Sequence, residues 1–316
     1  MNFKQLEYFV HVAELGGFSK AAVMLDIAQS ALSRQVRALE VELRETLLLR
    51  NGRGVVLTEA GQRLYEHGVN ILQALAQAQD DMGASRDAPV GRITIGLPPS
   101  VGRQLTLPLI DGFQRRLPAA RLAIVEGLSS HIGEWISTGQ VDLGLLYNPE
   151  AQPALEITPL IEESLCLVSP AGSTAPAPGS GAVLPLQTLP AWPLIVPERG
   201  HAIRKLLETQ AVLAGIKLNI AWEVSSIAVI LDLVCAGYGH AVLHASAVAA
   251  SDRANLLRVR PLVQPRLNSV LCLAVSAHKR PSPLMHQAAR LLIELVKSLP
   301  QGAAAPVPAA ATSQPG

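Results

Sequence analysis

Residues 28–40 read AQSALSRQVRALE, and this stretch carries two patterns on one predicted helix. Leu32, Val36 and Leu39 recur at helical spacing and predict a stripe that is buried against neighbouring helices. The other face consists of Gln29, Ser30, Ser33, Arg34 and Arg37. A solvated helix face usually mixes both signs of charge, whereas this face contains no acidic residue before Glu40. We infer that the face is kept clear for a negatively charged surface.

Two shorter segments before this stretch also predict helices. Residues 3–15 place apolar side chains at helical spacing, and the Gly-Gly pair that follows supplies a stop. Ser19 is suited to cap a second helix over residues 20–26, whose small side chains allow close packing. A tight turn at residues 26–28 leads into the next helix. Two short helices joined by so brief a turn, the second with a polar outer face, predict a helix-turn-helix.

A β-hairpin is predicted directly after these helices. In residues 46–58, TLLLRNGRGVVLT, two apolar runs flank an Asn-Gly-Arg-Gly segment. Asn-Gly between β-forming runs is a strong hairpin signal, and the tip of this hairpin presents Arg50 and Arg53. We therefore expect a wing beside the helices.

A long helix follows the wing. Thr58 is placed to cap it, and Glu59 lies in its first turn, where an acidic side chain is favourable. Positions 61, 64, 68, 71, 75, 78 and 82 step by alternating threes and fours and form a heptad seam with small residues in it. Such a seam predicts pairing with the same helix of another subunit; the alternative is docking on its own chain. The residues that we assign to dimerisation are Leu64, Gly68, Ile71, Leu75, Ala78 and Met82.

The chain changes character after a short polar linker at residues 83–91. Apolar strand-like runs then alternate with helical patterns, as in RITIGLPPS (92–100), and predict an α/β region with a largely parallel sheet. A second α/β unit begins near EESLCLVSP, and the last strand and helix return to the first unit. The expected parts are a first lobe over residues 91–162 and 268–299, a second lobe over residues 163–267, and a disordered tail over residues 300–316, which are rich in Ala, Pro, Gly and Ser.

Composition limits the class of protein. A chain of 316 residues, 49% of them hydrophobic, is long enough for two or three domains with sizeable cores. The formal charge is +1, and the first ninety residues hold nine Lys or Arg against eleven Asp or Glu, so affinity for nucleic acid depends on where the charges sit. Cys166, Cys235 and Cys272 are far apart in apolar runs and predict buried thiols rather than a redox pair or metal site. Without a signal peptide or an apolar stretch long enough to span a bilayer, we expect a reduced, cytoplasmic protein with no membrane contact.

The stretch from LEYFVHVAEL to LTEAG (residues 6–61) resembles LysR-type transcriptional regulators, and the resemblance extends over residues 2–299. Within that family, MNFKQLEYFV and HIGEWISTGQVDLGLLYN are similar to the nitrogen-assimilation-control-like group. The resemblance implies an α/β chain with an N-terminal all-α winged helix-turn-helix, a long linker helix and a two-lobed effector domain like that of periplasmic binding proteins. The implied domains are a DNA-binding domain over residues 1–58, a linker and dimerisation helix with a hinge over residues 59–90, and an effector-binding domain over residues 91–299.

The sequence departs from the family pattern at one turn. Where the family often reads Ser-Gln-Pro, this chain has Ala28, Gln29 and Ser30, so a side-chain cap and a helix-starting proline are both missing. Ser30 is the alternative cap, and capping there would shift the start of the helix.

The polar face of this helix has the chemistry that the major groove of DNA requires. Short side chains let a helix backbone approach, while Gln pairs with adenine edges and Arg with guanine edges. The resemblance assigns base reading to Gln29, Ser30, Ser33 and Arg34. Arg37 is expected to contact phosphate, and Arg50 and Arg53 to follow the DNA backbone or enter the minor groove. Solvated surface charge is the alternative for each arginine. The acidic residues from Glu40 onward are expected to limit the DNA footprint.

Helix starts in the second half predict a ligand cleft. In open α/β sheets, ligands sit at the carboxyl ends of strands, where helix N-termini offer unpaired N–H groups. Similar regulators use such positions for a small effector, and the donors present here suit a carboxylate. The expected effector-binding set is Ser100, Val101, Ser129, Ser130 and His201. Ordinary helix capping is the alternative role for the serines and for His201.

The resemblance implies a regulator that binds promoter DNA as a homodimer or homotetramer and contacts RNA polymerase. The nitrogen-control-like group is associated with regulators that need no effector, so the alternative is a C-terminal domain used for oligomerisation and polymerase contact alone. An enzyme is not expected, because the sequence lacks a G-x-S-x-G elbow, a P-loop and an H-E-x-x-H motif. A solute-binding protein, the more distant alternative, would lack the winged helix. No catalytic residue, metal site or cofactor is expected.

Overall fold

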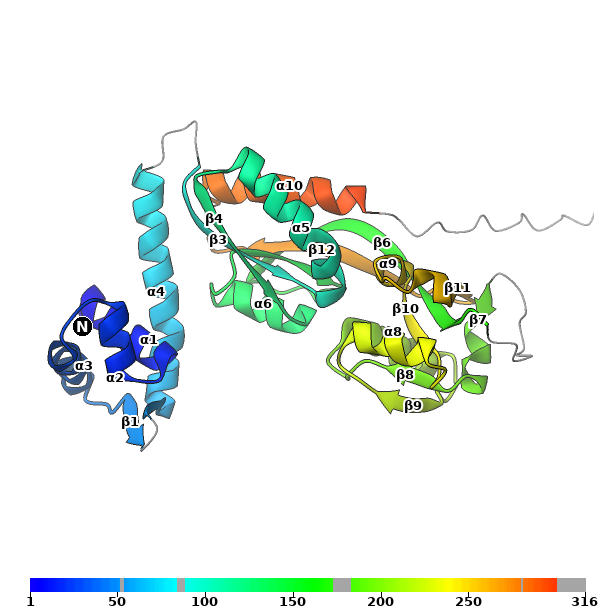
Figure 1. Cartoon of the computed structure of the whole chain (residues 1–316), viewed down its shortest axis with the longest axis horizontal. Coiled ribbons are helices and arrows are strands. Elements are labelled where there is room, and N and C mark those ends of the chain that lie inside the picture. The colour runs from blue at the N-terminus through cyan, green and yellow to red at the C-terminus, as the bar shows by residue number, and fades with distance from the viewer. Residues whose placement is uncertain (52–53, 84–88, 173–182, 280, 300–316) are drawn as a thin grey trace, which may run out of the picture.

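The computed structural model describes residues 1–51, 54–83, 89–172, 183–279 and 281–299. From left to right in Figure 1, a helical head is followed by the long helix α4 (Glu59–Gly83) and by an α/β region of two lobes. This order of parts confirms the predicted fold class. Arg53 on the predicted wing and the predicted tail over residues 300–316 lie outside the described residues.

The head is a helix-turn-helix with a wing. Its elements are α1 (Phe3–Leu15), α2 (Phe18–Met24), α3 (Gln29–Leu43), β1 (Leu48–Asn51) and β2 (Gly54–Leu57). Phe9, Leu32 and Leu39 are fully buried in the core that joins the three helices. Gly16 ends α1 in the left-handed conformation (φ 64°), which glycine adopts without strain. The antiparallel pairing of β1 with β2 forms the wing.

Two helix starts differ from the sequence predictions. α2 begins at Phe18 after Gly17, so Ser19 lies inside its first turn and is not the cap. α3 begins at Gln29 after Ala28, which has no capping side chain, and Ser30 does not take over that role. A side-chain cap contributes about 1 kcal/mol. Burying the apolar stripe of each helix contributes more than that, so packing rather than cap preference decides where these helices begin.

The first half of α4 packs against its own head. Thr58 Oγ1 accepts a hydrogen bond from the Gly61 N–H at 2.9 Å, which confirms the predicted cap. A β-carbon on Gly61 would collide with the Leu47 carbonyl oxygen, and one on Gly68 would lie 3.0 Å from the Leu6 side chain. This part of the seam therefore docks on the same chain, as one of the two alternatives from the sequence predicts.

The α/β region is built on a mixed sheet. Its elements are β3 (Gly91–Leu97), α5 (Pro99–Arg116), β4 (Ala120–Glu126), α6 (Ser129–Ser137), β5 (Leu143–Tyr147), β6 (Leu155–Pro170), β7 (Leu184–Pro185), η1 (Leu186–Ala191), β8 (Leu194–Val196), α7 (Ala202–Leu213), β9 (Ile220–Glu223), α8 (Ile227–Cys235), β10 (Ala241–His244), α9 (Ala245–Ala249), η2 (Ala254–Leu256), β11 (Leu257–Val263), β12 (Asn268–Ser276) and α10 (Pro283–Ser298). The strand order is β4-β3-β5-β12-β6-β11-β7, and β10 also pairs with β6. β3 is parallel to β4 and β5, whereas β12 is antiparallel to β5 and β6. The expectation of a largely parallel sheet is therefore wrong, because the returning strand β12 enters it in the opposite direction.

Three hydrophobic cores lie in this region among the described residues, the smallest of them under α6 around Ile132 and Ile136. The two larger cores belong to the two lobes. One includes Leu105, Leu145 and Leu292, and the other includes Ile195, Leu207 and Leu243. The long strands β6 and β12 cross between the lobes (Figure 1). β6 pairs with β12 along its first part and with β10 and β11 along its last part. The crossing strands bring the starts of α5 and α6 in one lobe to the starts of α7 and α8 in the other, at the edges of a cleft.

Candidate functional site

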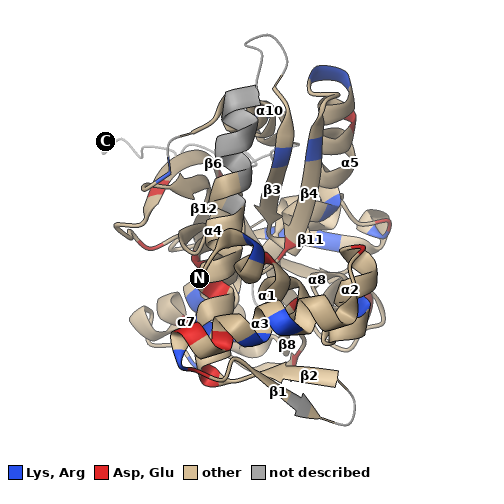
Figure 2. Cartoon of the chain, turned by 90° about the vertical axis from the view of Figure 1, so that its left-hand side faces the viewer, with Lys and Arg blue, Asp and Glu red and all other residues tan. Residues whose placement is uncertain are grey.

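The predicted base-reading residues lie together on α3. Leu32, Val36 and Leu39 point into the core with at most 1% of their surface exposed, so the opposite face of the helix points outward. The exposed side chains of that face are Gln29, Ser30, Arg34 and Arg37, and Ser33 is half-buried. Within the described part of the chain, neither Arg34 nor Arg37 forms an ion pair with a carboxylate. Figure 2 faces the head and shows basic segments on α3 at its surface.

The wing is attached to the same unit as α3. Arg50 lies on β1, opposite Val55 on β2. The Val55 N–H donates a hydrogen bond to the Gly16 carbonyl at 3.0 Å, and a β-carbon on Gly54 would collide with that carbonyl. The turn between α1 and α2 therefore holds the wing close to the helices.

Glu40 has a role that the sequence analysis missed. Its Oε1 accepts hydrogen bonds from the N–H groups of Leu47, at 2.9 Å, and Leu48, at 3.2 Å. The carboxylate thus binds the start of the wing, so its description as an acidic limit of the DNA footprint is incomplete. The signal in the sequence was the short connection between helix and hairpin, because the first N–H groups of a strand need acceptors from elsewhere.

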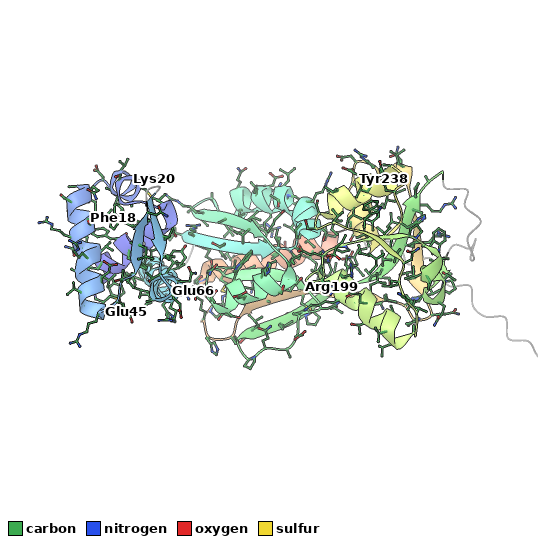
Figure 3. All side chains as sticks on the ribbon, turned by 90° about the horizontal axis from the view of Figure 1, so that it is seen from below. Phe18, Lys20, Glu45, Glu66, Arg199 and Tyr238 are labelled. Carbon is green, nitrogen blue, oxygen red and sulfur yellow. The ribbon has the colours of Figure 1, made fainter. Side chains whose placement is uncertain are left out.

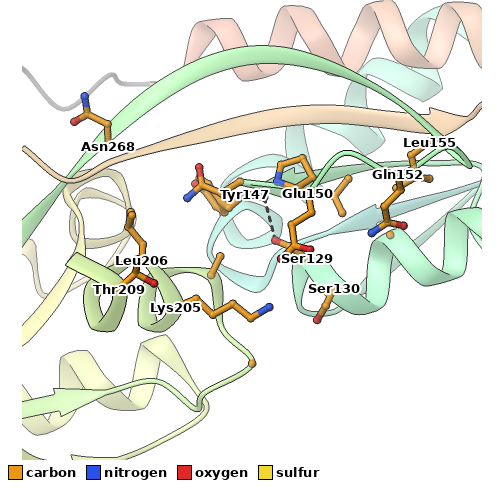
Figure 4. Close-up of a pocket in the computed structure, with 16 residues that line it drawn as sticks. Ser129, Ser130, Tyr147, Glu150, Gln152, Leu155, Lys205, Leu206, Thr209 and Asn268 are labelled. Carbon is orange, nitrogen blue, oxygen red and sulfur yellow. Dashed lines mark hydrogen bonds between the residues drawn. The ribbon is translucent and has the colours of Figure 1, made fainter. Parts of the chain in front are cut away.

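The cleft between the lobes contains two pockets. The first has a volume of about 530 Å³ and lies between α6 and α7 (Figure 4). Its lining includes Ser129, Ser130, Tyr147, Asn148, Lys205 and Asn268. The second has a volume of about 370 Å³ and lies between α5 and α8. Its lining includes Ser100, Arg103, Glu126, His201, Ser225 and Ser226. The predicted effector-binding residues are therefore split between two pockets.

Two residues of the predicted effector set contact other parts of the protein, one in the hydrophobic core and one through a backbone hydrogen bond. Val101 is 1% exposed in the core of the first lobe and lines neither pocket, so its assignment to a ligand is wrong. The reason is that the helical turn at the start of α5 directs Val101 inward. Ser129 Oγ accepts a hydrogen bond from the Tyr147 N–H at 3.0 Å (dashed in Figure 4). Its own O–H remains able to donate to a ligand.

Two aromatic rings connect the lobes beside the first pocket. Tyr147 on β5 stacks on His244 on β10, with ring centroids 4.6 Å apart. The Tyr147 O–H donates a hydrogen bond to Glu163 Oε2 at 2.6 Å. Burial, with the charge of Glu163 as the next cause, raises the pKa of Tyr147 well above its usual value, so the phenol stays protonated. Burial also lowers the pKa of His244, although Glu163 acts in the opposite direction.

Arg103 and Asp252 form an ion pair across the cleft. Arg103 Nη2 on α5 lies 3.2 Å from Asp252 Oδ2, which follows α9 in the other lobe. The arginine and aspartate side chains are 48% and 94% exposed, so the pair contributes about 0–1 kcal/mol. The sequence analysis missed Arg103, although it follows Ser100 by three positions and so lies on the same face of α5.

His201 caps a helix and also lines the second pocket. Its Nδ1 accepts a hydrogen bond from the Ile203 N–H at 3.2 Å, which confirms the capping alternative. Burial, with a smaller contribution from His244, lowers the pKa of His201 to about 4. The ring is therefore neutral near pH 7 and supplies no positive charge for a carboxylate ligand.

Lowering the pH from 7 to 5 is expected to destabilise the second lobe. An unfolded histidine binds its proton below about pH 6.5. Folded His201 does so near pH 4, so the unfolded state binds more protons between these values. The free energy of unfolding therefore falls as the pH is lowered, by about 2 kcal/mol between pH 7 and pH 5. Urea titrations of the full chain at pH 7 and pH 5 measure it. In a His201→Asn variant, which keeps a capping acceptor and does not titrate, this part of the loss should disappear; an unchanged loss contradicts the assignment.

The predicted dimerisation seam on α4 packs partly against the head of the same chain and is partly exposed. Leu64 and Gly68 pack against the head of the same chain. Ile71 is 37% exposed, and Leu75 is half-buried. The remaining side chains, which the structure does not describe, are those of Ala78 and Met82. Pairing of α4 with another subunit stays a prediction, and Ile71 and Leu75 are the described seam residues left for it.

Three further features bear on the class of protein. Among the described residues, no group of three or more His, Cys, Asp or Glu side chains has a geometry for a metal ion. Cys166 and Cys272 are buried and Cys235 is half-buried, all three as free thiols, and burial raises the pKa of Cys166 to about 11. The helices of the described residues contain none that is both long and apolar enough to cross a membrane.

Comparison with known proteins matches both halves of the chain to one family. Residues 3–62 match the bacterial regulatory helix-turn-helix protein model of the lysR family, and residues 86–298 match the LysR substrate binding domain. The chain is 31% identical to the nitrogen assimilation regulatory protein nac of Klebsiella aerogenes over 297 residues, which cover 94% of this chain and 95% of that protein. It is 30% identical to nac of Escherichia coli K12, with 94% and 96% covered.

Solved structures share the complete architecture. A single-residue variant of full-length OxyR from Pseudomonas aeruginosa superposes with a TM-score of 0.73 at 24% identity, covering 95% of this chain and 96% of that one, and shows a common fold. Full-length CbnR in complex with its target DNA superposes with a TM-score of 0.70 at 25% identity, covering 93% and 100%. With the family models matching over most of its length, the chain belongs to the LysR family of bacterial transcriptional regulators.

Proposed function

We propose that this regulator binds promoter DNA as a homodimer or homotetramer in the cytoplasm and acts on transcription through contact with RNA polymerase. The observation that supports this most directly is the exposed face of α3 beside the wing, which carries no acidic residue between Gln29 and Arg37. In this proposal Gln29, Ser30, Ser33 and Arg34 read bases and Arg37 contacts phosphate. Arg50 and Arg53 on the wing follow the DNA backbone or enter the minor groove.

Selection of DNA fragments from a random library by the purified full chain tests this function. We expect enrichment of a sequence with two half-sites separated by about 10 base pairs or a multiple of this, because the recognition helices of a dimer enter successive major grooves. Failure to enrich any sequence above the input library would contradict the proposal.

Exposed apolar side chains offer surfaces for self-association beyond α4. On α5, Leu107 is 69% and Ile110 is 40% exposed, and on β9 of the other lobe Trp222 is 54% exposed. Contiguous exposed apolar surface is typical of sites of protein contact, and Leu107 and Ile110 lie one turn apart on the same face of α5. We infer that this face of α5 takes part in contacts with a second copy of the chain.

We further propose that a small carboxylate binds in the second pocket. Arg103 supplies a positive charge there. The start of α5 has no side-chain cap, and the N–H groups of Val101 and Gly102 donate to the Pro98 carbonyl, which leaves the Ser100 N–H in the first turn to donate to an anion. Ser100 and Ser226 add hydroxyl groups, while Glu126 on the same lining disfavours an anion next to it. We therefore place the ligand carboxylate on the Arg103 side of the pocket.

The helix α4 provides a route from the cleft to the DNA-binding head. Gly68 packs on Leu6 of the head, and Asn70, two positions later, lies on the opposite side of α4. The Asn70 Oδ1 is 3.0 Å from the position of a β-carbon on Gly139 in the first lobe. A ligand that binds two arrangements of the lobes with different affinities would favour one of them. Through α4, that change would alter the relative orientation of the DNA-binding heads in the dimer.

Calorimetric titration of the full chain with a panel of small carboxylates tests the proposed ligand. We expect saturable binding by at least one compound and a loss of affinity of roughly 10-fold or more in an Arg103→Ala variant, because a charge-assisted hydrogen bond is removed. Arg115→Ala, on the same helix in its exposed last turn, is the matched control and should bind normally. Absence of binding by every compound in the panel would contradict the carboxylate proposal.

A regulator that needs no effector is the second candidate. The Arg103–Asp252 ion pair and the Tyr147–His244 stack already connect the lobes without a ligand. Under this alternative, the two lobes serve oligomerisation and polymerase contact, and DNA selection succeeds while the carboxylate titrations show no binding.

A further inference from the structure

The recognition helix α3 and the wing are joined by one carboxylate oxygen. Glu40 Oε1 accepts hydrogen bonds from the N–H groups of Leu47, at 2.9 Å, and Leu48, at 3.2 Å. Leu47 is 1% and Leu48 is 8% exposed, so these N–H groups lie where water has little access. Buried backbone donors require an acceptor, and Glu40 provides it for both.

Other contacts hold the wing to different parts of the head. The Val55 N–H donates to the Gly16 carbonyl between α1 and α2, and Thr58 Oγ1 donates to the Thr46 carbonyl at 2.6 Å at the start of α4. Glu40, in contrast, is itself part of α3 and lies on the turn after Arg37. Its bonds therefore set the position of the wing relative to the helix that reads bases.

We propose that Glu40 is a positioning residue for DNA recognition, which holds the wing so that it and the base-reading face of α3 contact DNA together. Leu48 is the first residue of β1, and β1 pairs with β2 from Leu48 to Asn51, so a shift at Leu48 moves the whole hairpin. Loss of the acceptor would leave two buried N–H groups unpaired, and the hairpin would turn until they found new partners. The contacts made by the wing would be lost, while the side chains on the first turns of α3 would keep their positions.

Substitutions that separate the acceptor from the charge test this role. Glu40→Gln removes the charge and keeps a carbonyl oxygen as acceptor, whereas Glu40→Ala removes both. Glu45→Ala is the matched charge control, because Glu45 is exposed at the edge of the head (Figure 3). Binding of each full-chain variant to a duplex selected from a random library by the wild-type protein is measured by fluorescence anisotropy at several salt concentrations.

The acceptor model predicts a distinct result for each variant. Glu40→Ala should weaken binding about 10-fold and reduce the slope of log affinity against log salt by about 2–4 for a dimer, as expected for the loss of one or two phosphate contacts per subunit. Glu40→Gln should stay within about 3-fold of wild type with an unchanged slope, and Glu45→Ala should leave the slope unchanged. In an Arg50→Ala background, Glu40→Ala should reduce the slope by less, because one wing contact is already absent.

Three results would overturn the proposal. They are a Glu40→Gln variant as weak as Glu40→Ala, a Glu40→Ala variant with the wild-type salt slope, and fully additive slope changes for Glu40→Ala and Arg50→Ala. Thermal melts of the same samples identify a variant that does not fold. If Glu40→Ala is unfolded, Glu40→Asp replaces it, because its shorter side chain keeps the charge and cannot reach both N–H groups from the same backbone position.

Discussion

Replacing Arg34 by alanine is expected to weaken binding to the selected DNA by roughly 30-fold or more and to relax the base preference at the position that Arg34 contacts. A bidentate arginine–guanine pair discriminates by about 1–3 kcal/mol, and a dimer carries two such arginines, so the total loss is about 2–6 kcal/mol. Arg34 is exposed and has no carboxylate partner among the described residues, so its loss should leave the fold intact. Competition binding with a set of single-base variants of the DNA measures both effects.

Arg37 is the matched comparison for Arg34 on the same helix. Arg37→Ala should weaken binding to all sequences by similar factors and lower the salt slope by about 2 for a dimer, because it removes one phosphate contact per subunit. Equal losses of base preference in the two variants would show that the separate roles proposed for Arg34 and Arg37 are wrong.

Replacing Gly61 by alanine is expected to destabilise the head by about 3 kcal/mol or more. The new β-carbon would collide with the Leu47 carbonyl oxygen, which is backbone and cannot rotate away as a side chain can. That carbonyl also accepts a hydrogen bond from the Thr58 N–H at 3.0 Å. For a domain of this size, such a loss lowers the melting temperature by roughly 10–20 °C. Differential scanning calorimetry of the full chain measures it, and DNA binding should fall in parallel because the wing and α4 meet at this contact.

Gly17→Ala is the control for the glycine substitution. Gly17 has an extended backbone (φ 179°) that any residue adopts, and a β-carbon there would meet nothing within 4 Å. Its effect on stability should stay within about 0.5 kcal/mol. If both variants melt at the wild-type temperature, the close packing of α4 at Gly61 does not contribute the expected free energy to the stability of the head.

The architecture of the head followed from local patterns. The buried stripe of α3, the glycine stop after α1 and the Asn-Gly hairpin depend on residues close together in the sequence, and all three agree with the structure. The helix start assigned to Ser19 was wrong, and the alternative cap at Ser30 is not used, because packing in the core outweighed capping preference. The mixed direction of the sheet was missed because strand direction depends on where the chain returns, which composition and alternation do not contain.

The sequence predicted the DNA-binding face more completely than the residues of the cleft. Periodicity alone placed the base-reading residues on one face, because a helix determines which side chains lie together. The cleft serines were expected from helix starts, yet their division between two pockets depends on how the lobes meet. The inward direction of Val101 follows from the orientation of α5 on its sheet, which its position after Ser100 did not reveal.

The sequence by itself therefore determined the order of the parts, the polar face of α3 and the family, since each of these depends on short-range periodicity and motif spacing. The tertiary structure decided which partners distant groups have. Glu40 bonds to the wing, Gly68 packs on its own head, and Arg103 pairs with Asp252 across the cleft. The physical reason is that such contacts depend on the relative placement of whole elements, and that placement is set by the summed packing of the cores rather than by the residues that meet.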